Sequence, residues 1–220
     1  MALESVVRKM SNREAWSLDR GLLLAYADDI IITGNTRAEV QMNMKKLMKA
    51  SKNIGLVVNA EKIKYMVVTR GPEDSSNLKI ENNDFEQVKE FRYLGVTLNN
   101  KNIMHEEINV RLNAANRCYF AMETLFKSKT LSKKFKEKLY VSYIRPVLTY
   151  ACATWSSTKG DEEKLRRFER KILRRIQGPV FNTETQQWEL RSNAQLENLY
   201  KKENIEQFIK SIRMQWAGHA

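Results

Sequence analysis

The chain has 220 residues, 42% of them apolar, so it can bury a core as one large domain or two small ones, and wholesale disorder is excluded. No apolar run approaches about 18 residues and the N-terminus is charged, which excludes a membrane span and a signal peptide. Cys118 and Cys152 lack paired spacing, which argues against a disulfide framework or a zinc site, and we expect an intracellular protein, nuclear or cytoplasmic.

The first hundred residues are predicted to mix strands with helices. A helix is expected over residues 2–10, and two short apolar runs, 22–25 and 30–33, are typical of the arms of a β-hairpin. Thr36 is a suitable N-cap for a helix that extends to about residue 53. Further elements are expected as strands at 56–58, 65–69 and 91–98 and as a hairpin over 79–91.

The second half is predicted to be helical, because the apolar spacing changes from a period of 2 to one of 3.6 after residue 100. Four helices are expected, one with an apolar face from Ile108 to Phe126, and the others over 131–155 (kinked at Pro146), 161–177 and 194–216. We place a domain border here, between residues 1–100 and 101–220. The predicted fold class is α+β, a small antiparallel sheet with helices followed by an all-α basic region.

Charge changes at the same border. Residues 1–100 carry 15 basic against 13 acidic side chains, whereas residues 101–220 carry 23 against 13, out of a net charge of +12. A basic excess on one segment indicates a polyanionic partner. A solvated lysine-rich surface is the alternative.

Asp28 and Asp29 stand side by side between the two apolar runs of the first predicted hairpin. Adjacent carboxylates repel and raise each other's pKa unless a cation neutralises them. Mg²⁺ prefers carboxylate oxygens, and a pair of such ions supports nucleotidyl transfer. The alternative is an ordinary solvated turn, in which Asp is common.

The stretch Tyr26-Ala27-Asp28-Asp29 resembles the YxDD motif of the reverse transcriptase palm, in the YADD form usual among non-LTR retrotransposons. Other segments resemble that family in the same order. Residues 2–8 are similar to the helix after its template-contacting segment, 55–62 to its GLxxNxxKT element, 91–95 to its FxYLG primer-grip hairpin, and 167–179 and 212–219 to its thumb and post-thumb. The resemblance implies a partial palm over 1–100 and a helical thumb and post-thumb over 101–220.

The resemblance also implies roles for individual residues. Asp28 and Asp29 would bind Mg²⁺ as catalytic carboxylates, and Tyr26 and Ala27 would contact the incoming nucleotide or the primer. Lys62 would lie near the triphosphate as a catalytic cation. An exposed turn lysine is its alternative.

Tyr93, Leu94 and Gly95 would hold the primer end by the same resemblance. Plain strand packing is the alternative for these residues, and Leu94 is expected in the core in either case.

The first palm aspartate of the family has no counterpart here. It stands on a strand well before the YxDD pair, and Asp19, which lacks a buried strand around it, does not replace it. The fingers also have no counterpart. Because positioning supplies much of the rate in such transfers, we expect the two-metal site to be incomplete and polymerase activity to be negligible.

The predicted helix over 161–177 is rich in basic residues. Arg166, Arg170 and Arg174 recur at i, i+4 and i+8 on one face. This face could follow a nucleic-acid backbone, and a solvated face with ion pairs is the alternative. The residues expected to contact the backbone are Arg166, Arg167, Arg170, Lys171, Arg174 and Arg175.

Three functional hypotheses remain open. In the first, the chain is a segment of an RNA-directed DNA polymerase, whose partners would be an RNA template, a DNA primer and dNTP. In the second, it is a non-catalytic nucleic-acid-binding module. In the third, it is an inert retrotransposon relic. The sequence does not indicate an oligomeric state, a template preference or a target site.

Overall fold

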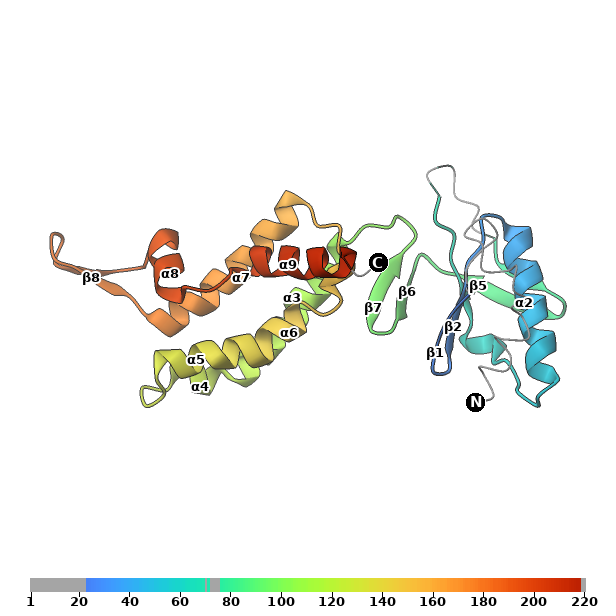
Figure 1. Ribbon diagram of the computed structural model, residues 1–220, viewed down its shortest axis with the longest axis horizontal. Coiled ribbons are helices and arrows are strands. Elements are labelled where there is room, and N and C mark those ends of the chain that lie inside the picture. The colour runs from blue at the N-terminus through green and yellow to red at the C-terminus, as the bar shows by residue number, and fades with distance from the viewer. Residues whose placement is uncertain (1–22, 70, 72–75, 219–220) are drawn as a thin grey trace. The chain divides into compact units, whose positions relative to one another are not determined.

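The computed structural model describes residues 23–69, 71 and 76–218 and divides into two units (Figure 1). Unit 1 comprises Met1–Phe91 and Asn99–Lys101, and unit 2 comprises Arg92–Leu98 and Asn102–Ala220. The helix expected over 2–10 lies outside the described residues. Within the described ranges, no helix is both long and apolar enough to cross a membrane.

In its described residues, unit 1 combines short strands with the helix α2. Its strands lie in small sheets, β1 with β2 and β4 with β5 antiparallel, whereas the short β3 runs parallel to β5. The strands of unit 1 are β1 Leu23–Tyr26, β2 Asp29–Ile32, β3 Lys64–Tyr65, β4 Leu78–Ile80 and β5 Asn83–Gln87. The strands β6 Glu90–Tyr93 and β7 Val96–Asn99 follow, and their residues 92–98 belong to unit 2. The helix α2 spans Arg37–Lys52, and a 3-10 turn spans Ala60–Lys62.

The core of unit 1 lies between α2 and the β3–β5–β4 sheet. Met44 and Leu47 from α2 pack with Leu78, Ile80 and Phe85 from β4 and β5. Helix α2 begins where expected, because the Thr36 side chain accepts a hydrogen bond from the Glu39 N–H.

Unit 2 is mainly helical. Its elements are α3 His105–Ala121, α4 Glu123–Lys127, α5 Lys133–Leu139, a π-helical turn Tyr140–Ile144, α6 Arg145–Leu148, a 3-10 turn Cys152–Thr154, α7 Lys159–Gln177, β8 Val180–Asn182, β9 Gln187–Glu189, α8 Asn193–Tyr200 and α9 Ile205–Ala217. In Figure 1, α5 and α6 follow one another as one rod, and the β8–β9 hairpin extends beyond α8. The amphipathic α7 contributes a large share of the buried side chains.

The core of unit 2 is a single cluster drawn from α3 to α9. Trp155, Tyr140 and Phe126 are among its largest fully buried side chains. The start of α7 is fixed by a capping box, in which the Thr158 side chain and the Asp161 carboxylate each bind the other residue's backbone N–H.

The α+β fold class is confirmed, since unit 1 holds small sheets and unit 2 is mainly helical. The first hairpin, α2 and the helix over 161–177 are found close to their expected bounds.

Several expected elements differ in the structure. Residues 56–58 form no strand, and the strand expected over 65–69 is the two-residue β3. The single strand expected over 91–98 is the hairpin β6–β7, because the backbone turns at Leu94 and Gly95.

The long helices expected in unit 2 are also interrupted. The helix expected over 131–155 ends at Leu148, beyond a π-helical turn that precedes Pro146. The helix expected over 194–216 is split, because Lys201 takes a left-handed conformation and Asn204 starts α9 as its N-cap. The β8–β9 hairpin was not expected.

Candidate functional site

The paired aspartates lie at the tip of the β1–β2 hairpin. Tyr26 is paired with Asp29, so Ala27 and Asp28 form a two-residue turn, in which Ala27 has a φ of 53°. Asp28 and Asp29 are both exposed, and the side chain of Tyr26 is 65% exposed. The turn therefore presents two adjacent carboxylates to solvent, where a cation can reach them.

The strands around this pair are less buried than expected. Ile30 and Ile32 of β2 pack against the core of unit 1, but Leu24 of β1 is 43% exposed. Within the described residues β1 pairs with β2 alone, so its other edge and one face are uncovered. The core of unit 1 thus holds the Asp28–Asp29 turn in place through β2.

Two carboxylates do not by themselves form a two-metal site. Asp28 and Asp29 offer the oxygen ligands that Mg²⁺ prefers. Across the described ranges, however, no three His, Cys, Asp or Glu side chains come together in a group that could hold a metal ion. Metal binding by Asp28 and Asp29 therefore stays a prediction.

Lys62 lies at the end of the 3-10 turn, in the same unit as the aspartates. The Asn59 side chain accepts the Glu61 N–H and so caps this turn, while Ala60 packs against the core of unit 1. The turn is thus held in place, and the Lys62 side chain is exposed. Its role near a triphosphate stays a prediction.

Tyr93, Leu94 and Gly95 stand at the turn of the β6–β7 hairpin. Leu94 and Gly95 have φ of 46° and 80°, a left-handed conformation that favours glycine at the second position. Leu94 is 39% exposed, so its expected place in the core is wrong, because the turn directs it outward. The primer-holding role of the three residues stays a prediction.

A buried ion pair anchors this turn to α3. Arg111 Nε donates to Glu107 Oε1 at 2.5 Å, and Glu107 Oε2 accepts the Thr97 N–H at 2.8 Å. Arg111 also donates to the Gly95 carbonyl, and its guanidinium lies 4.5 Å from the ring centroid of Tyr150.

The Tyr150 hydroxyl completes the anchor, because it donates to the Leu94 carbonyl at 2.8 Å. Both carbonyls of the turn thus have partners, and the hairpin tip has a fixed position on α3 within unit 2.

The predicted basic face of α7 is largely engaged within the chain. Arg166 pairs with Glu206 at 3.2 Å, Arg170 donates to Glu163 at 2.7 Å, and Arg174 donates to Asn193 Oδ1 at 2.7 Å. The contacts of Arg166 and Arg174 hold α7 to α9 and α8, whereas the contact of Arg170 lies within α7. Hydrogen bonds from Arg170 and then Arg167 also lower the pKa of Glu163.

A different row of α7 is exposed. Arg167, Lys171 and Arg175 are accessible, and the Arg167 side chain is 73% exposed although it pairs with Glu163. The sequence placed all six basic residues on the expected contact surface, and the structure presents these three to solvent. Backbone binding by the six residues stays a prediction.

The starts of α3 and α7 are joined by a polar contact. His105 Nδ1 lies 2.5 Å from Asp161 Oδ1, and Lys164 Nζ lies 3.0 Å from His105 Nε2. Burial raises the pKa of Asp161, but hydrogen bonds from Thr158 and His105 outweigh burial, so the pKa lies below its usual value.

A second buried carboxylate joins three elements. Glu169 of α7 accepts from the Tyr140 hydroxyl and from the Ile205 N–H that begins α9, both at 2.9 Å. Burial raises the pKa of Glu169 and that of Tyr140, and it raises the pKa of the neighbouring Tyr200 to about 12. This group fixes the helices and is remote from solvent.

The sequence reasoning missed the contribution of α3. Glu107 and Arg111 stand at i and i+4, a spacing that indicates an ion pair. The spacing does not reveal that the pair is buried under the hairpin tip. The sequence also offered no reason to single out Asn109, Asn113 and Asn116, which lie on one face of α3.

Comparison with known proteins bears on the first unit and on the chain as a whole. Residues 1–98 match the family model described as reverse transcriptase (RNA-dependent DNA polymerase). The chain is 27% identical over 205 residues to a transposon-derived protein of Caenorhabditis elegans, a match that covers 89% of this chain and 70% of that protein. No solved structure matches the chain.

Proposed function

We propose that the chain is part of the RNA-directed DNA polymerase of a non-LTR retrotransposon, because residues 1–98 match the reverse transcriptase family model. Its substrates would be an RNA template, a DNA primer and dNTP. The relative in Caenorhabditis elegans is described as transposon-derived, which supports a mobile-element origin.

The observation that carries the proposal is the turn of the first hairpin. Within the segment that matches the family, Asp28 and Asp29 stand adjacent and exposed at the tip of β1–β2. Reverse transcriptases use divalent metal ions, and carboxylates at an exposed turn are suitable ligands. The proposed role of this pair is to hold Mg²⁺ at the site of nucleotidyl transfer.

Other residues of the first segment would position the reactants. Tyr26 and Ala27 adjoin the pair and would contact the nucleotide or the primer end. Lys62 would place its positive charge near the triphosphate. The carbonyls of Leu94 and Gly95 already have partners, so the β6–β7 turn would present a rigid edge to a primer.

The helical unit would hold the template–primer duplex. Arg167, Lys171 and Arg175 are accessible basic residues in the body of α7 and would make the first phosphate contacts. Arg166, Arg170 and Arg174 are engaged with α8 and α9 or with Glu163, so their charge would act mainly through the local positive potential.

Metal binding tests the role of the hairpin. Mn²⁺, a paramagnetic substitute for Mg²⁺, should broaden the amide NMR signals of residues 23–32 at low occupancy, and Asp28→Asn should abolish this effect. Asp84→Asn is the matched control, since Asp84 is an exposed aspartate of the β4–β5 hairpin without an adjacent carboxylate. Equal broadening in wild type and Asp28→Asn would remove the basis for the proposal.

Duplex binding tests the role of the helical unit. Affinity for an RNA–DNA duplex, measured by filter binding, should fall as salt rises, with a linear dependence of log K on log salt. An affinity that does not change with salt would show that basic side chains do not hold the duplex.

A non-catalytic nucleic-acid-binding module is the second candidate. It is favoured by the lack of a third carboxylate beside the pair among the described residues, together with the exposed basic row of α7. Salt-dependent duplex binding without any Mn²⁺ effect at residues 23–32 would identify this candidate as the correct one.

A further inference from the structure

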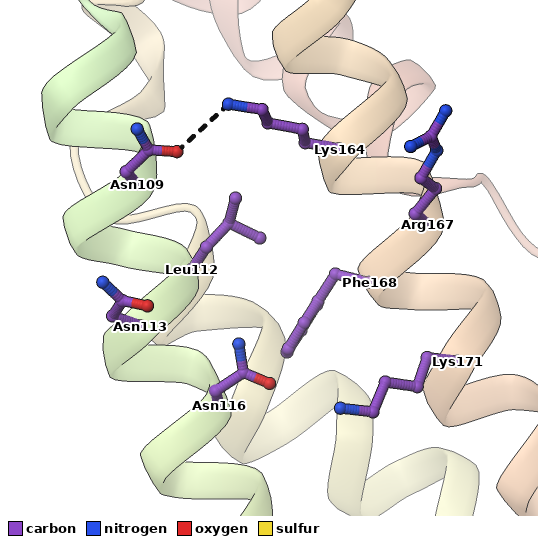
Figure 2. A pocket seen from close by; sticks show the side chains of 8 residues that line it. All are labelled: Asn109, Leu112, Asn113, Asn116, Lys164, Arg167, Phe168 and Lys171. Carbon is purple, nitrogen blue, oxygen red and sulfur yellow. Dashed lines mark hydrogen bonds between the residues drawn. The ribbon is translucent and has the colours of Figure 1, made fainter.

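An open groove of about 640 Å³ runs between α3 and α7 (Figure 2). Its volume lies within the range in which proteins hold small ligands or parts of larger ones. The two walls differ in chemistry. Figure 2 shows asparagine side chains along α3 and basic side chains along α7, with Phe168 between the helices; Lys164 and Lys171 reach toward α3, and Arg167 extends away from it. The polar residues that line the groove are Asn109, Asn113 and Asn116 from α3, and Lys164, Arg167 and Lys171 from α7.

The asparagine wall is unusual for a helix. Asn109, Asn113 and Asn116 stand at i, i+4 and i+7, which places them on one face of α3. Asparagine is a weak helix former, because its side chain competes for backbone hydrogen bonds. Three asparagines on one helical face therefore act against the local fold, which points to a role outside it.

Two of these amides have unused hydrogen-bonding capacity. Asn109 accepts from Lys164 Nζ at 3.4 Å. In the described part of the chain, the side chains of Asn113 and Asn116 form no hydrogen bond with another protein group, and both line the groove. An amide both donates and accepts, so its natural partner also has donors and acceptors, as the edges of nucleobases do.

The opposite wall supplies positive charge along the groove. Lys164, Arg167 and Lys171 recur at i, i+3 and i+7 of α7. Arg167 and Lys171 are exposed. A row of three cations matches the successive phosphates of an extended strand better than it matches one small anion.

An aromatic ring stands beside the basic row. Phe120 is 56% exposed although it is a large apolar side chain, and Lys171 Nζ lies 5.4 Å from its ring centroid. Phe120 follows Asn116 by one helical turn on α3. Exposed aromatic rings next to basic side chains are the platforms on which proteins stack unpaired bases.

The groove is held open by contacts at its start. His105 of α3 and Asp161 of α7 lie 2.5 Å apart, and this junction fixes the two helices where the groove begins. The groove therefore exists before any ligand binds, and binding requires little ordering of the protein.

We propose that the groove between α3 and α7 binds single-stranded nucleic acid, with phosphates on Lys164, Arg167 and Lys171, base edges on Asn113 and Asn116, and one base stacked on Phe120. A duplex does not fit these features, because its bases are already stacked and paired. An acidic peptide would use the basic wall and could pair its backbone with the amides, but its acidic side chains have no flat ring to stack on Phe120. The inference goes beyond the proposed function, since it needs neither a duplex nor a polymerase site; Arg167 and Lys171 would serve both ligands, so a single strand in the groove would compete with the duplex for them.

The test uses the whole chain and a fluorescein-labelled single strand of 12 nucleotides, prepared as RNA and as DNA of the same sequence. Fluorescence anisotropy measures the binding affinity. Asn113→Ala/Asn116→Ala and Phe120→Ala should each weaken binding by about tenfold or more, the loss expected for a stacked or hydrogen-bonded base. Neither variant changes the net charge, and alanine favours the helix, so neither electrostatics nor misfolding of α3 would explain the loss in the double variant.

Trp188→Ala is the matched control for Phe120→Ala, because Trp188 is also an exposed aromatic residue but lies on the β8–β9 hairpin. It should bind the single strand as wild type does. If the groove variants lose affinity for RNA and DNA alike, the site recognises features that the two strands share. If they lose affinity for RNA alone, the site recognises RNA. Both results support the proposal.

Three results would overturn it. These are wild-type affinity in both groove variants, an equal loss of affinity for an RNA–DNA duplex, and displacement of the strand by poly-glutamate as effectively as by unlabelled strand. Failure of the proposed function gives a different result, since wild-type protein would then fail to bind the duplex while the groove variants still lost single-strand binding.

Discussion

Replacement of Arg111 should loosen the β6–β7 turn and destabilise unit 2. Arg111→Met keeps the side-chain volume but removes the partner of a buried carboxylate. Glu107 is 1% exposed, and after the substitution the Thr97 N–H still donates a hydrogen bond to it. The Gly95 carbonyl also loses its donor.

The expected loss follows from these two groups. Removal of one partner of a buried ion pair costs about 3–5 kcal/mol, because the other charge stays buried without compensation. The Thr97 hydrogen bond partly satisfies Glu107, so we expect the lower end, about 3 kcal/mol. Glu107→Gln in the same chain removes the stranded charge, and the double variant should lose only about 1 kcal/mol, as for a neutral hydrogen bond.

Two measurements check this prediction. Urea unfolding followed by circular dichroism at 222 nm reports mainly on unit 2, and hydrogen exchange reports on the amides of residues 92–98. These amides should exchange on the order of 100-fold faster in Arg111→Met, since each 1.4 kcal/mol is a factor of ten. A loss below about 1 kcal/mol, or a double variant as unstable as the single one, would refute the role of the buried pair.

Three further substitutions test other parts of unit 2. The pKa of Asp161 lies below its ordinary value of 3.8, so its contribution to stability is present above pH 3.8 and is lost as the pH falls through the lower folded value. Asp161→Asn should therefore flatten the acid side of a melting-temperature profile, and an unchanged profile would contradict this. Glu169→Ala leaves the Tyr140 hydroxyl and the Ile205 N–H buried without an acceptor and should cost roughly 2–5 kcal/mol in urea unfolding; a loss under about 1 kcal/mol would mean that water replaces the carboxylate. Gly95→Ala should cost about 1 kcal/mol because φ is 80° and no close contact blocks the new methyl group, so an unchanged stability would indicate that the turn relaxes.

Elements whose ends depend on neighbouring residues could be predicted from the sequence. Thr36 predicted the start of α2, and the apolar runs on both sides of Asp28 and Asp29 predicted the first hairpin. The break before α9 was also readable, since Asn204 and Gln207 form a capping box, but the apolar spacing of residues 194–216 obscured it.

Features that depend on distant contacts could not be predicted in this way. The i, i+4, i+8 spacing of Arg166, Arg170 and Arg174 identified a face of α7 but not the elements that cover it. The turn at Leu94 was predicted as a strand, because a left-handed leucine has no local signal and is held by Tyr150 from 56 residues away in sequence.

The asparagine face of α3 shows the same limit at the candidate site. The spacing of Asn109, Asn113 and Asn116 is visible in the sequence. A groove exists only because α7 lies opposite this face, and the position of α7 is set by long-range packing around Phe168 and Ile172.

Primer extension is the measurement that tests the central claim most directly. The chain would be incubated with an RNA template, an annealed DNA primer, dNTP and Mg²⁺, with Asp28→Asn as the control. Asp28 and Asp29 supply two carboxylates without a third beside them among the described residues, so we predict no incorporation above the Asp28→Asn level. Incorporation that Asp28→Asn abolishes would contradict this prediction and would show that the pair supports polymerisation within this chain.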